Sequence, residues 1–126
     1  MARVWMALLG GALAAPLAGQ AAAGQADGVQ TLCSGLGLEE QAEADAGGFS
    51  LKAVGAEAAT GAYVGDISVR VLQGDRVVAG ADCEGPWFLA HLPAGRYVVE
   101  MAYQGQIKRQ SVSVPREGRR EVTFGF

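Results

Sequence analysis

Residues 85–100 constrain the fold more than any other part of this chain. They read GPWFLAHLPAGRYVVE, so that two runs of strand-forming residues flank a Pro-Ala-Gly turn. Pro93 presets the φ angle of the turn, and Gly95 permits the positive φ that a type II turn requires. Because the stretch is rich in apolar side chains and poor in groups that carry out chemistry, it predicts a fold class without naming an activity.

An alternation of apolar and polar residues begins at Phe49 and continues to the C-terminus. Gly, Pro and Asp residues that form turns interrupt it at intervals of about ten residues, which is typical of an antiparallel sandwich. We therefore predict an all-β, seven-stranded antiparallel β-sandwich. Its strands are expected near residues 49–53, 67–71, 76–81, 87–91, 97–103, 112–114 and 122–126.

Two segments precede the predicted strands. Residues 24–33 are rich in Ala, Gly and Gln and are expected to form a flexible leader. Residues 38–46 (LEEQAEADA) have high helix propensity and carry acidic residues in the first turn, where the helix dipole favours them. Gly47 and Gly48 then end the helix. One short N-terminal helix, lying across an end or an edge of the sheet, is therefore predicted.

Residues 1–23 have the pattern of a cleavable secretory signal peptide. Arg3 supplies a positive charge, residues 4–17 form an apolar run, and Ala21 and Ala23 frame an A-x-A cleavage site. The apolar run is shorter than the roughly 18 to 20 residues that span a bilayer. We expect a periplasmic or secreted protein without stable membrane insertion after cleavage, with an uncleaved anchor as the alternative. The folded domain then covers residues 34–126.

Cys33 and Cys83 are the only cysteines of the chain. In an oxidising compartment an even number of cysteines indicates a disulfide, which would tie the N-terminal segment to the loop before Trp87. Two separate thiols or an intermolecular bridge are the alternatives. Two cysteines without neighbouring histidines are too few for a metal site.

The net charge of −3 argues against nucleic acid as the main partner. Basic residues are nevertheless concentrated near the C-terminus. They form either a solvated surface or a docking patch for an acidic partner, and they are Lys108, Arg109, Arg116, Arg119 and Arg120.

Three motifs carry a resemblance to a known family: DISVRV at residues 66–71, Gly-Pro-Trp at residues 85–87 and Leu-Pro-x-Gly-x-Tyr at residues 92–97. Together they resemble the carboxypeptidase regulatory-like domains, and most closely the small exported bacterial proteins of that type. The resemblance spans residues 34–126 and implies a transthyretin-like (prealbumin-like) sandwich. The motif residues are assigned to the structural turn and core; they are Gly85, Pro86, Trp87, Leu92, Pro93, Gly95 and Tyr97.

This sequence contains few residues of the types that form catalytic or metal-binding sites. His91 is the only histidine, which leaves no basis for a histidine metal cluster or for the two-histidine machinery of the transthyretin-like hydrolases. The His-x-x-Glu motif of the carboxypeptidase zinc domain is also missing. Asp82 and Glu84 could in principle bind calcium beside Asp66 or Asp75, but they lack the dense spacing of calcium loops. We expect no enzyme activity, no metal and no cofactor.

Three classes of function remain. The first is a noncatalytic exported module that binds an envelope or periplasmic protein as an accessory factor, through edge strands or end loops. The second is a carbohydrate-binding module that uses Trp87, Tyr63 and Tyr103 as an exposed aromatic platform. The third is a transthyretin-like hydrolase.

Overall fold

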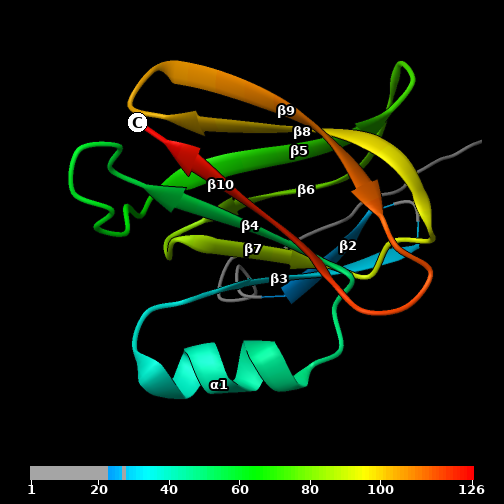
Figure 1. The fold of residues 1–126 in the computed structure, drawn as a ribbon, viewed down its shortest axis with the longest axis horizontal. Helices are drawn as coiled ribbons and strands as arrows, with labels where there is room; N and C mark the ends of the chain where they lie inside the picture. The colour runs from blue at the N-terminus through cyan, green and yellow to red at the C-terminus, as the bar shows by residue number, and fades with distance from the viewer. Residues whose placement is uncertain (1–22, 27) are drawn as a thin grey trace, which may run out of the picture.

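The strands of this protein form two sheets that stack as a sandwich (Figure 1). The computed structural model describes residues 23–26 and 28–126. One sheet has five strands and the other has four, so the all-β sandwich predicted from the sequence is confirmed. The predicted signal peptide lies outside the described residues, except for Ala23.

The five-stranded sheet has the order β10-β4-β7-β3-β2. Its pairs are antiparallel except for β4 and β10, which run parallel with Leu51 opposite Arg120. The prediction of a wholly antiparallel sandwich is therefore wrong for this pair. In chain order the strands are β2 (Ala23–Ala26), β3 (Val29–Ser34), β4 (Leu51–Ala56), β7 (Trp87–Ala90) and β10 (Arg120–Gly125).

The four-stranded sheet has the order β6-β5-β8-β9 and is antiparallel throughout. Gln104 and Gly105, with φ angles of 48° and 81°, form the tight turn between β8 and β9, as in a hairpin whose two central residues need positive φ. Its strands are β5 (Ile67–Gln73), β6 (Arg76–Cys83), β8 (Gly95–Tyr103) and β9 (Gln106–Val114).

Two strands precede the seven that the alternation predicted. Residues 24–33 were expected to be a flexible leader, but Val29–Ser34 forms β3 and lies between β2 and β7. Thr31 and Ser34 are buried there. The predicted domain start at residue 34 therefore falls at the end of a strand that belongs to the sheet.

The alternating strands bury one face between the sheets, as the sequence predicts. Ile67, Val69 and Val71 of β5 are almost completely buried. They pack with inward side chains of the five-stranded sheet, among them Phe88 and Phe124. Burial of this continuous apolar layer is the main favourable contribution to folding.

Helix α1 (Leu38–Ala46) covers the outer face of the five-stranded sheet, where it lies below β3 in Figure 1. Ala44 is buried in a second apolar cluster with Val54, Trp87 and Leu89. The helix itself is where the sequence predicts it. Its position is not at an end or an edge of the sheet, because this second cluster holds it against the face.

The disulfide between Cys33 and Cys83 is present and joins β3 to β6. It therefore links the two sheets to each other. The predicted pairing is confirmed, and the alternative of two separate thiols is excluded in this structure.

Candidate functional site: the open face of the four-stranded sheet

The Gly-Pro-Trp element is packed tightly against the end of β3. A Cβ atom on Gly85 would lie 2.4 Å from the carbonyl oxygen of Ser34, so only glycine fits without a shift of the backbone. Trp87 is 3% exposed. These contacts give the element a structural role and leave it little surface for a ligand.

The Leu-Pro-x-Gly-x-Tyr element is also held by internal contacts. The hydroxyl of Tyr97 donates to the carbonyl oxygen of Pro93 at 2.8 Å, and the backbone N–H of Leu92 donates to Ser50 Oγ at 2.9 Å. Burial raises the pKa of the Tyr97 hydroxyl. Gly95 has a φ of 159°, which is far from the roughly +80° of a type II turn. The φ of Gly95 is therefore positive, as expected, but the type II geometry is not adopted, because this residue begins β8 in a nearly extended conformation.

The ring of Trp87 lies against the ammonium group of Lys52, beneath α1. Lys52 Nζ lies 3.3 Å from the centroid of a Trp87 ring, in a cation–π arrangement. The same ammonium lies 3.6 Å from Asp45 Oδ1 and 3.9 Å from Glu121 Oε1. Lys52 is buried, and these partners compensate its charge.

Arg119 fastens the end of α1 to the start of β10. Its guanidinium donates to Asp45 Oδ1 at 2.9 Å and to the carbonyl oxygen of Phe49 at 3.1 Å. The hydrogen bond from Arg119 and the nearby charge of Lys52 hold the pKa of the Asp45 carboxyl below its usual value. These polar contacts at the C-terminal end of the helix position it on the sheet.

The three aromatic residues predicted as a ligand platform do not come together. Tyr63 is 53% exposed and meets Trp87 edge-on, with ring centroids 6.1 Å apart. Tyr103 packs instead against Phe126 at 5.3 Å. With Trp87 buried, only Tyr63 offers an exposed ring, and no observation favours carbohydrate binding.

Histidine and acidic residues do not assemble a metal-binding group in the described part of the chain. His91 stacks on the ring of Phe49, with centroids 4.2 Å apart. Asp66, Asp82 and Glu84 line a hollow of about 220 Å³ at the start of β5, and Asp82 accepts a hydrogen bond from Ser68. Among residues 28–126, however, no group of three His, Cys, Asp or Glu side chains could hold a metal ion.

The outer face of the four-stranded sheet has no helix over it in the described structure. α1 lies on the opposite sheet (Figure 1). The side chains on β5, β8 and β9 that alternate with the core residues point away from the sandwich. We call this surface the open face; it comprises Ser68, Arg70, Leu72, Arg96, Val98, Glu100, Ala102, Ile107, Arg109, Ser111 and Ser113.

A row of three charged side chains crosses the middle of the open face. Arg70, Glu100 and Arg109 are directly opposite one another on β5, β8 and β9. Glu100 Oε1 accepts from Arg70 Nη2 at 2.6 Å and from its Nε at 3.0 Å, while Glu100 Oε2 accepts from Arg109 Nε. The hydrogen bonds from Arg109 and then Arg70 lower the pKa of the Glu100 carboxyl. Because two arginines flank one glutamate, the row carries a net positive charge.

The Glu100→Gln variant is expected to be less stable than wild type at pH 7 by about 1 to 2 kcal/mol, because two charge-assisted contacts are lost from a buried carboxylate with partly exposed partners. A carboxyl whose pKa is lowered by folding contributes stability above its unfolded pKa and loses it as the pH falls. Urea unfolding from pH 7 to about pH 2 should therefore show the two proteins converging in acid. A difference that stays constant with pH would contradict this role of Glu100.

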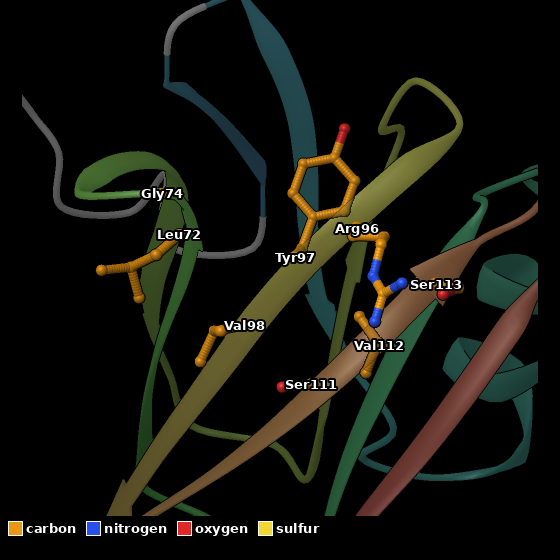
Figure 2. A pocket seen from close by; sticks show the side chains of 8 residues that line it. All are labelled: Leu72, Gly74, Arg96, Tyr97, Val98, Ser111, Val112 and Ser113. Carbon is orange, nitrogen blue, oxygen red and sulfur yellow. The ribbon is translucent and has the colours of Figure 1, made fainter.

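The second feature of the open face is a hollow of about 220 Å³ next to the turn between β5 and β6 (Figure 2). Leu72 and Val98 are opposite each other in register, as are Arg96 and Ser113. The hollow thus has two apolar side chains on one side and a guanidinium with a hydroxyl on the other. Its lining residues are Leu72, Gly74, Arg96, Tyr97, Val98, Ser111, Val112 and Ser113.

β9 and β10 are edge strands of different sheets, and side-chain hydrogen bonds join them along their length. We call the boundary between these two strands the seam. Lys108 Nζ donates to the carbonyl oxygen of Gly125 at 2.7 Å, and Gln110 Nε2 donates to that of Thr123 at 2.8 Å. Arg120 Nε donates in the other direction, to the carbonyl oxygen of Ser113 at 3.0 Å. These contacts occupy backbone acceptors that an added strand would need, so strand addition along this seam is disfavoured.

The basic residues near the C-terminus therefore do not form one docking patch. Lys108 and Arg120 lie in the seam, and Arg119 contacts α1. Arg116 is exposed in the loop after β9, and only Arg109 belongs to the open face. No sequence motif marks Arg70, Arg96 or Glu100 as site residues. Each is a polar residue in an alternating strand, which by itself indicates no more than a solvated position.

Neither the family models nor the curated proteins with which the sequence was compared match this chain. Within the described residues, no helix has the length and apolar character needed to cross a membrane.

Proposed function

We propose that this chain is a noncatalytic, exported β-sandwich module that binds an envelope or periplasmic protein through its open face. The proposal places it among the transthyretin-like, carboxypeptidase regulatory-like modules, on the strength of the three sequence motifs. The proposal rests on one difference between the two sheets. α1 covers the outer face of the five-stranded sheet, whereas the outer face of the four-stranded sheet is open to solvent.

The composition of the open face supports a protein partner. Ile107 and Arg109 are exposed on it, next to the small side chains of Ala102 and Ser111. Arginine is enriched in protein interfaces and in their hot spots, and the exposed side chain of Ile107 adds apolar surface beside it. The three arginines of the face outnumber the two carboxylates there, which are Glu100 and, opposite Ser68 on the neighbouring strand β6, Asp82. The chain as a whole has a net charge of −3, so this local positive charge would be complementary to an acidic partner surface.

Export is supported by the signal-peptide pattern and by the disulfide between Cys33 and Cys83, since disulfides persist mainly in oxidising compartments. In that setting the module acts by binding and catalyses no reaction itself.

Site-specific photo-crosslinking in the periplasm tests the proposal. A photoreactive amino acid at Ile107 is expected to give an adduct of defined mass, and the same amino acid at Leu38 on α1 is not. The two positions are matched, because both are exposed aliphatic residues, with 62% and 83% of their surfaces accessible. The protein in the adduct is identified by mass spectrometry and purified.

Binding of that purified protein should be lost in Ile107→Asp and retained in Leu38→Asp. Equal adduct yields at the two positions, or no adduct at Ile107, would argue against the open face as the binding surface.

A further inference from the structure

We infer that the hollow beside Arg96 binds the C-terminal residue of a partner chain, with its free carboxylate at Arg96 and an aliphatic side chain against Leu72 and Val98. This inference rests on the proposed function and names the chemistry that the open face recognises.

Arg96 is the one guanidinium of the open face that is free for a ligand. Arg70 and Arg109 both bind Glu100, whereas Arg96 forms no hydrogen bond or ion pair with any described residue. Its backbone is fixed in register, with Tyr97 buried next to it. A planar guanidinium carried on this fixed backbone matches the two oxygens of a carboxylate.

Two serine hydroxyls of β9 line the hollow. Ser113 is directly opposite Arg96, and Ser111, two residues earlier in β9, is directly opposite Val98. The carbonyl oxygen of Ser113 accepts from Arg120 Nε, which helps to hold this part of β9 in place. Neither hydroxyl forms a hydrogen bond within residues 28–126, so both can donate to a bound carboxylate.

The other side of the hollow is apolar and small. Leu72 and Val98 face each other across β5 and β8, and Figure 2 shows both side chains on the far side of the hollow from Ser113. A volume of about 220 Å³ is below the roughly 300 to 1,000 Å³ of common small-molecule pockets. It suits a single amino-acid residue that carries a carboxylate and an aliphatic side chain together.

The position of the hollow favours a chain end over an internal residue. It adjoins Gly74, where β5 ends and the turn to β6 begins, so the open face stops there (Figure 2). An extended segment that crosses the row of Arg70, Glu100 and Arg109 and runs along β8 reaches the end of that strand at Arg96. A partner chain that ends at this point with its terminal carboxylate does not have to continue beyond the sheet.

The test uses protein purified from the periplasm and three short peptides, followed by NMR titration. The first peptide, acetyl-Gly-Ser-Gly-Leu with a free carboxylate, should shift the backbone amide signals of Arg96, Ser111 and Ser113 saturably. The same peptide with an amidated C-terminus should bind at least tenfold more weakly. The third peptide, acetyl-Gly-Glu-Gly-Leu-amide, carries only an internal carboxylate and should also bind at least tenfold more weakly.

Arg96→Gln should weaken binding of the first peptide at least tenfold. Arg116→Gln removes the same charge from an exposed position in the loop after β9 and should change binding less than twofold. Equal binding of the acid and the amide, tighter binding of the internal glutamate, absence of saturable shifts, or no effect of Arg96→Gln would each overturn the inference. If the adduct at Ile107 still forms in such a case, the proposed function stands and only the terminal-carboxylate site is wrong.

Discussion

Replacement of Cys33 and Cys83 by alanine is expected to lower the free energy of unfolding by about 4 kcal/mol. The two cysteines are 50 residues apart in the sequence, and the disulfide between them reduces the conformational entropy of the unfolded chain. The link also has a structural consequence. It joins β3 to β6, and the two strands belong to different sheets. Loss of the bond should therefore loosen the side of the sandwich opposite the seam between β9 and β10.

Urea unfolding of the purified proteins, with and without reductant, measures this effect. Reductant should lower the midpoint of wild type to near that of the double variant and leave the double variant unchanged. Cys33→Ala alone should cost nearly as much as the double replacement, since either change removes the bond. A fully reduced wild type that keeps the midpoint of the oxidised protein would contradict the prediction.

β5 could be predicted from the sequence because it has one buried and one exposed face. Ile67, Val69 and Val71 alternate with polar residues, and this period of two is itself the signal of a half-buried strand. For β9 (Gln106–Val114) only residues 112–114 were predicted, because every residue before Val112 in this strand is exposed and gives no such signal. The same alternation cannot give strand direction. The parallel pairing of β4 with β10 leaves the buried positions Ala53 and Val122 on the same face as an antiparallel pairing would.

β3 was missed for a different reason. Residues 24–33 have the composition of a flexible terminus, and the strand within them is stabilised by its neighbours, β2 and β7, and not by local propensity. The disulfide was the available signal. A bond from Cys33 to Cys83 fixes this segment against the sandwich, which is hard to reconcile with a flexible leader.

The open face could not be predicted because it depends on register. Glu100 lies 30 residues from Arg70 and 9 from Arg109, and the three meet only because β5, β8 and β9 align in one particular way. A shift of one residue would place Glu100 in the core. The hollow at Arg96 likewise follows from the pairing of Arg96 with Ser113 and of Leu72 with Val98.

β7 is the strand on which the two apolar clusters of the protein meet. All four of its residues are buried, with Phe88 and Ala90 in the sandwich core and Trp87 and Leu89 beneath α1. A uniformly apolar strand has no polar face to orient it. Alternation along the strand places Trp87 and Leu89 on one face, but nothing in the sequence indicates that this face lies under the helix.

Phe88→Ala is expected to lower the free energy of unfolding by about 3 to 5 kcal/mol, because a fully buried ring is removed from a core that can close only partly around the cavity. Phe88 is opposite Cys33 on β3 and Ala53 on β4, so the strands on both sides of β7 limit that closure. Urea unfolding of the oxidised protein measures the cost. Leu38→Ala, at an exposed position, should change stability by less than about 0.5 kcal/mol.

The combination of Phe88→Ala with loss of the disulfide separates two contributions to the same part of the fold. Small domains are stable by about 5 to 15 kcal/mol, so the two changes together are comparable with the whole stability of the protein. Because Phe88 and Cys33 are cross-strand neighbours, the two costs need not add. We expect the combined variant to be largely unfolded at 25 °C by circular dichroism, whereas Phe88→Ala with the disulfide intact stays folded. A combined variant that unfolds at the midpoint of Phe88→Ala alone would mean that the bond between β3 and β6 adds nothing once the core is opened.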